Sequence, residues 1–97
     1  MTDQQQDCLR GYTSMIEAFL QGSLTVADFE SQYLARFKQE GVELPTKVFE
    51  QLDALFGGVD AFCVDAAART PNQIGETELR FMAQTVLRAL RKLISKA

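Results

Sequence analysis

The sequence predicts an all-α protein: an antiparallel up-down-up-down four-helix bundle, with residues 1–97 forming a single domain. Three observations predict this fold. Apolar residues recur with helical spacing in four segments, and no segment alternates apolar and polar residues as a half-buried strand does. The links between these segments are short, about 3 to 10 residues, so consecutive helices should lie side by side in opposite directions. Hydrophobic residues make up 46% of the chain, which is enough for one core.

The first helix is expected to end at Gly22, and the second to begin after Thr25. The apolar stripe of the first helix is Leu9, Tyr12, Ile16, Phe19 and Leu20. Gly22 follows it as a C-cap glycine, and Thr25 with Asp28 three residues later forms a weak version of the capping box. Gly41 is expected to end the second helix, whose apolar face is Val26, Phe29, Tyr33 and Phe37.

The third helix is expected to begin with Pro45 in its first helical position. Its apolar stripe is Val48, Leu52, Leu55, Phe56, Val59 and Phe62. Gly57 and Gly58 interrupt this stripe, and each costs about 1 kcal/mol relative to alanine inside a helix. Either the helix bends at this point or two backbones pass closely. The fourth helix is expected over about residues 76–95, with Leu79, Met82, Val86, Leu90 and Leu93 facing inward.

Composition argues against several classes of protein. The net charge of -3 disfavours direct binding of nucleic acid, which requires a surplus of Lys and Arg. The N-terminus is polar, without the apolar region of a secretory signal, and no apolar run approaches the roughly 20 residues of a membrane span. Cys8 and Cys63 form no metal or redox motif and are expected to be reduced. A cytoplasmic protein without membrane contact is therefore expected.

The sequence offers no site for catalysis, metal or cofactor. Histidine, the commonest general base and metal ligand, is absent from the chain. The carboxylates Asp60 and Asp65 have no neighbouring groups that would hold a substrate. Asp65 and Glu76 have the spacing of the first and last ligands of a calcium-binding loop, but Ala67 and Arg69 stand where that loop needs ligands. We therefore expect neither an enzyme nor a metalloprotein.

The charge distribution is the strongest functional signal. Residues 40–78 contain eight acids and two bases, whereas residues 79–97 contain five bases and no acid. Asp60 and Asp65 flank Phe62, and Glu76 and Glu78 follow in the first turn of the fourth helix. These acids have two interpretations. In the first, the acids are structural: they cap helices and interact favourably with the positive end of the helix dipole. In the second, they form one negative surface that replaces the phosphates a basic protein binds.

Several stretches resemble the colicin D-like immunity proteins, which include immunity proteins of contact-dependent growth inhibition systems. The similarity lies in residues 15–29, 44–45, 49–56 and 60–65, and in Arg69, Ile74, Glu76, Leu79 and Arg80. It implies a small helical bundle that binds the nuclease domain of a cognate bacterial toxin and covers its basic active site with an acidic face. In the colicin D case the toxin cuts tRNA anticodon loops.

The resemblance also implies which residues contact the toxin. Asp60 and Asp65 match acidic positions of the family's face, and Glu76, Glu78 and Asp53 are further candidates. Phe62 is a candidate for the desolvated centre of the interface and equally for the core, and Phe49 is a second candidate for that centre. Cys63 and Val64 stand where acids or a proline would fit the family pattern, so this face is less acidic.

A helical adaptor or dimerisation module without a toxin partner is the alternative function. It would associate with itself through exposed aromatic residues such as Phe49 or Tyr33, and its association would be insensitive to salt. For the favoured function, the free protein is expected to be a monomer or a weak dimer.

Overall fold

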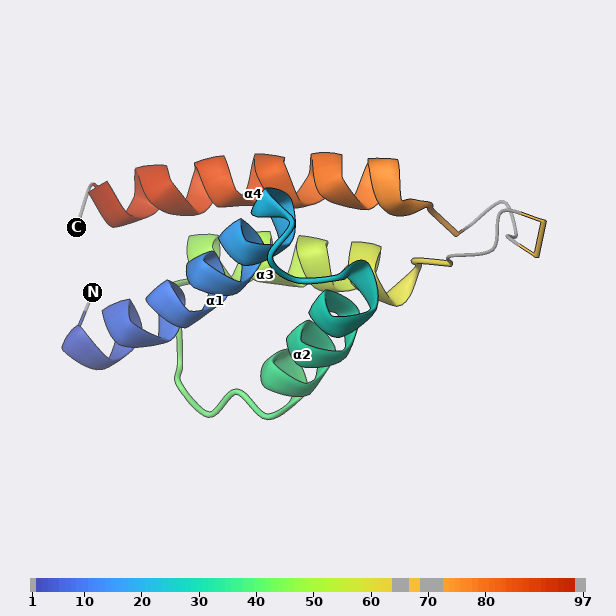
Figure 1. The fold of residues 1–97 in the computed structure, drawn as a ribbon. Coiled ribbons are helices and arrows are strands. Elements are labelled where there is room, and N and C mark those ends of the chain that lie inside the picture. The colour runs from blue at the N-terminus through green and yellow to red at the C-terminus, as the bar shows by residue number, and fades with distance from the viewer. Residues whose placement is uncertain (1, 64–66, 69–72, 96–97) are drawn as a thin grey trace.

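The computed structural model describes residues 2–63, 67–68 and 73–95. Its four α-helices are α1 (Asp3–Gln21), α2 (Val26–Lys38), α3 (Thr46–Asp60) and α4 (Glu76–Ser95). Successive helices run in opposite directions, and the main contacts join α1 with α2, α2 with α3, α3 with α4, and α4 with α1 (Figure 1). The described residues thus form an elongated four-helix bundle of 45 × 24 × 19 Å, which confirms the predicted fold.

Local sequence signals set the turn between α1 and α2. Gly22 adopts a left-handed conformation with a φ of 85°, and its backbone N–H donates to the carbonyl of Phe19. This conformation favours glycine because a Cβ would be strained there. The Thr25 hydroxyl accepts the backbone N–H of Asp28 at 3.1 Å, which satisfies one of the free amides at the start of α2. Both predicted caps are confirmed.

The end of α2 differs from the prediction. The helix stops at Lys38, and Gln39 rather than Gly41 caps it. The Glu40 carboxylate explains the early end, because it accepts the backbone N–H of Val42 at 3.1 Å and the Cys8 thiol at 3.0 Å. These contacts turn the chain toward α1 before the glycine is reached.

Helix α3 continues through both glycines. It begins at Thr46 with Pro45 as N-cap, one residue later than predicted. A Cβ on Gly58 would lie only 2.6 Å from Cε of Met82, whereas nothing lies within 4 Å of the corresponding position on Gly57. The close approach predicted at this point is therefore between the α3 backbone and a side chain of α4, not between two backbones.

The core lies where the four helices meet and contains an aromatic cluster. The Phe19 and Phe29 rings stack with centroids 4.3 Å apart, and the Tyr33 hydroxyl donates to the carbonyl of Leu52 at 2.7 Å. Tyr33 has no exposed surface, so the expectation that it is an exposed aromatic was wrong. The other fully buried large side chains are Leu9, Tyr12, Ile16, Leu52, Leu55, Leu79 and Leu90.

A short backbone pairing joins the end of α3 to the start of α4. Phe62 and Ile74 form an isolated parallel bridge, in which the N–H of Cys63 donates to Ile74 and the N–H of Ile74 donates to Ala61, both at 2.9 Å. Because α3 ends at Asp60, Phe62 does not continue the helical stripe, contrary to the prediction. Within the described ranges, no helix is both long enough and apolar enough to cross a membrane.

Candidate functional site

Three of the predicted contact residues lie at one end of the α3–α4 pair. Asp60 is the last residue of α3, and Glu76 and Glu78 lie in the first turn of α4. All three are exposed, and the backbone pairing between Phe62 and Ile74 brings the two helix ends together. The structure thus gathers acids that are 16 to 18 residues apart in sequence. Asp65, the other leading candidate, lies outside the described residues.

Glu76 and Glu78 already have structural partners. Glu76 accepts a hydrogen bond from Nε of Arg80 at 2.8 Å, and the Glu78 carboxylate accepts the backbone N–H of Gly75 at 3.1 Å. Arg80 also donates to the carbonyl of Phe19 at 3.0 Å and lies over its ring. For these two acids, the contacts match the structural interpretation, in which carboxylates cap and stabilise the helix start.

A row of carboxylates follows the outer face of α3. Glu50, Asp53 and Asp60 are spaced at i, i+3 and i+10, which places them on one side of the helix, and all three are exposed. We call these three residues the acidic strip. Among the residues that the structure describes, none of the three forms an ion pair. As far as the described residues show, the strip therefore presents to solvent negative charge that forms no ion pair.

Glu50 was not among the predicted contact residues. The signal that would have identified it is its spacing of three residues from Asp53, which places the two carboxylates about one helical turn apart. The sequence argument concentrated on acids near Phe62 and did not follow the outer face of the third helix toward its start.

The predicted aromatic contacts have different environments. Phe62 is half-buried and packs against the core, so only part of its side chain faces solvent. Phe49 is 49% exposed, and its ring stacks on Phe37 with centroids 5.8 Å apart. Phe81, which the sequence argument did not select, is 70% exposed. Its position off the apolar stripe of α4 is the signal that distinguishes it from core residues.

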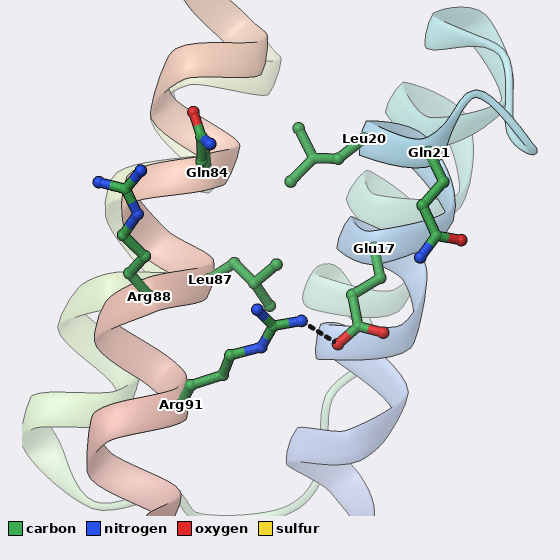
Figure 2. A pocket seen from close by; sticks show the side chains of 7 residues that line it. All are labelled: Glu17, Leu20, Gln21, Gln84, Leu87, Arg88 and Arg91. Atoms are coloured by element: carbon green, nitrogen blue, oxygen red, sulfur yellow. Dashed lines mark hydrogen bonds and ion pairs between the residues drawn. The ribbon is translucent and has the colours of Figure 1, made fainter.

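The bases of α4 face a different part of the bundle. A hollow of about 250 Å³ lies between α1 and α4. Among its lining residues, Arg88 and Arg91 come from α4 and Glu17 comes from α1 (Figure 2). Arg91 donates to Glu17 at 2.8 Å, and both side chains are more than a third exposed. An exposed pair of this kind contributes about 0–1 kcal/mol. In this pair, a base of α4 offsets an acid of α1.

A partly buried polar cluster ties α1 to the end of α2. Burial, together with the hydrogen bond to Glu40, raises the pKa of the Cys8 thiol from 9.0 to about 11. Burial alone would raise the pKa of Glu40, but the Cys8 thiol and the Val42 N–H lower it below 4.5. Arg36 donates to the Cys8 carbonyl at 3.2 Å. Because a thiol with a raised pKa is a weak nucleophile, this cluster is structural.

The exposed acids suit contact with a basic surface rather than chemistry at one point. In the described part of the chain, no group of three or more His, Cys, Asp and Glu residues is arranged to hold a metal ion. The acidic strip extends over ten residues, about 15 Å of helix, so its charges are spread along a line. Such an arrangement attracts a partner with an extended positive surface.

A family model described as bacterial self-protective colicin-like immunity matches residues 8–92, a range that includes the whole of α2 and α3 and most of α1 and α4. No curated protein and no solved structure matches the chain.

Proposed function

The chain belongs to the bacterial self-protective colicin-like immunity family, and we propose that its acidic strip covers the basic active site of a toxin nuclease. Membership of the family makes it a protein that neutralises a bacteriocin toxin. The observation that carries the proposal is the row of carboxylates at Glu50, Asp53 and Asp60 on one exposed helix face, which form no ion pair with any other described residue.

The charge of the strip fits the surface that a nuclease must expose. An enzyme that cuts nucleic acid holds phosphates with Lys and Arg, and these bases attract a negative protein surface in the same way. Long-range attraction raises the association rate, which matters for a protein that must capture a toxin before it damages the cell. The net charge of -3 supports an acidic inhibitor of this kind.

The predicted contacts divide into two groups. Asp53 and Asp60, with Glu50, are free to form ion pairs with toxin residues, and Asp65 is proposed to extend the same contact beyond the described residues. Glu76 and Glu78 already accept hydrogen bonds from Arg80 and Gly75. They are proposed to contribute to the negative potential near the end of α3 rather than to bind toxin residues directly.

We further propose that the toxin cleaves tRNA and that neutralisation takes place in the cytoplasm. The resemblance to colicin D-like immunity proteins supports a tRNA-cleaving toxin, and such a toxin acts where its substrate lies. The inhibitor itself needs no cofactor, metal or catalytic residue for this role, since it acts by occupying the active site.

The test is binding to the cognate toxin domain, which is to be sought in the reading frame adjacent to the one that encodes this chain. The double variant Asp53→Lys/Asp60→Lys should slow association on the order of tenfold or more at low salt, because the two lysines cancel the attraction exerted by the strip. Added salt should slow association of the unaltered protein and have little effect on the double variant. Asp3→Lys/Asp28→Lys, which makes the same charge change on α1 and α2, is the control and should associate much faster than the strip variant.

Two results would count against the proposal. If the unaltered protein neither binds the adjacent toxin domain nor blocks its cleavage of tRNA, the proposed target is wrong. If the strip variant and the control associate at equal rates, the toxin is not captured through the acidic strip. Circular dichroism of each variant establishes that the helical fold is retained.

A further inference from the structure

The most exposed large apolar side chain of the described residues borders a groove between α3 and α4. Phe81 on α4 is 70% exposed. A groove of about 200 Å³ lies beside it, lined by Gln51, Ala54, Phe81, Met82, Thr85 and Val86. A single exposed phenylalanine is common on protein surfaces, but one that forms the wall of an apolar groove marks a site for a partner.

The groove depends on small residues where the two helices meet. Gly58 lets Met82 lie against the α3 backbone, since Cε of Met82 lies 2.6 Å from the place that a Cβ would take. Because Met82 packs against the α3 backbone, the short side chains of Ala54 and Thr85 leave space on the solvent side of Met82. The groove can therefore receive one apolar side chain without any movement of the helices.

The charges around the groove favour a basic partner. Glu50 and Asp53 lie on the same helix as Gln51 and Ala54, and Glu78 lies one turn before Met82 on α4. Among the bases of α4, Arg80 is directed to α1, where it donates to the carbonyl of Phe19.

The charge also changes along the helix pair. Because α3 and α4 are antiparallel, Asp60 and Glu78 lie at one end, while Lys47 in the first turn of α3 and Lys92 in the last turn of α4 lie at the other (Figure 1). A basic partner would therefore be oriented with its positive charges toward the Asp60 end.

We propose that the toxin inserts an apolar side chain into the groove between α3 and α4, against Phe81, while its basic residues contact the acidic strip. This inference rests on the proposed function and adds the part of the interface that determines how long the complex lasts. The strip increases the rate of capture, and the groove slows dissociation, because a desolvated aromatic contact carries most of the binding energy in interfaces of this kind.

The experiment compares two exposed residues of α4 in binding to the same toxin domain. Phe81→Ala should increase the dissociation rate constant about 30-fold, the change expected when an aromatic anchor is truncated, and should leave the association rate constant within about twofold. Gln84→Ala is the control. Gln84 is exposed on the same helix but lines the hollow between α1 and α4 instead of the groove, and its truncation should leave the dissociation rate constant within about threefold.

The outcomes separate this inference from the proposed function. If Phe81→Ala dissociates as slowly as the unaltered protein while the strip variant still associates slowly, the inference that a toxin side chain enters the groove is wrong and the toxin-binding function stands. If the unaltered protein does not bind the toxin domain, both fail. Sedimentation tests whether the free protein forms a dimer. If it does, and the Phe81→Ala variant is a monomer, the occupant of the groove is a second copy and the inference of a toxin side chain is wrong.

Discussion

Alanine at Gly57 and alanine at Gly58 should have different effects on stability, although the two positions are adjacent in one helix. Both lie inside α3, so both substitutions remove the cost of a glycine in a helix, about 1 kcal/mol. Gly57 is exposed, and a Cβ there meets nothing within 4 Å. Gly57→Ala should therefore stabilise the protein by about 1 kcal/mol, which raises the Tm by roughly 4–8 °C in a domain of this size.

Gly58→Ala removes the same cost of a glycine inside a helix, but it places a methyl group where Met82 lies. The added Cβ would lie 2.6 Å from Cε and 2.8 Å from Sδ of Met82, so that side chain must move away from α3. Overpacking of this kind costs about 1–3 kcal/mol. The net result should be a change between roughly zero and 2 kcal/mol of destabilisation, and Gly58→Ala should be less stable than Gly57→Ala by about 1–3 kcal/mol.

Urea unfolding followed by circular dichroism gives the free energy of unfolding of both variants. An unchanged m-value shows that the two variants differ in stability and not in the compactness of the unfolded state. The double variant Gly58→Ala/Met82→Ala tests the cause. Without the Met82 side chain beyond Cβ, alanine at position 58 should stabilise relative to Met82→Ala alone. The reasoning is refuted if Gly58→Ala stabilises as much as Gly57→Ala, because Met82 would then not constrain position 58.

Two further predictions concern the partly buried cluster between α1 and α2. Glu40 has a lowered pKa in the folded protein, so it stabilises the fold above pH 4.5, and this contribution is lost as the pH falls through the folded pKa. The stability difference between the unaltered protein and Glu40→Gln, from urea unfolding, should shrink between about pH 7 and pH 3, and a constant difference would contradict the assignment. Because the pKa of Cys8 is about 11, the thiol in a Cys63→Ser variant should react with a disulfide reagent at pH 8 at least about tenfold more slowly when folded than in urea. Equal rates would show that Cys8 is accessible.

The helices could be predicted from sequence because their signals are local. The apolar stripe of α1, the left-handed Gly22 and the Thr25 cap each depend on residues within a few positions of one another, and each was confirmed. The predictions were wrong where contacts between residues far apart in the sequence decide the structure. Helix α2 ends before Gly41 because Glu40 contacts Cys8, 32 residues away, and Tyr33 is buried because α3 supplies the carbonyl of Leu52.

The candidate site was only partly accessible to sequence reasoning. Asp53 and Asp60 are exposed as the negative-surface interpretation requires. Glu76 and Glu78 instead bond to Arg80 and Gly75, contacts that fit the structural interpretation. The contacts of Glu76 and Glu78 thus fit the structural interpretation, whereas a toxin contact through Asp53 and Asp60 stays a proposal.

The sequence by itself determined that this chain forms four amphipathic helices with an acidic middle and a basic end, because periodicity, caps and charge are properties of the residue order. Only the tertiary structure decided which charges remain free, which phenylalanine faces solvent and where the helices leave a groove. Those features depend on how α3 and α4 approach each other, and that approach depends on Met82 lying over Gly58. Two residues 24 positions apart thus shape a surface that neither identifies alone.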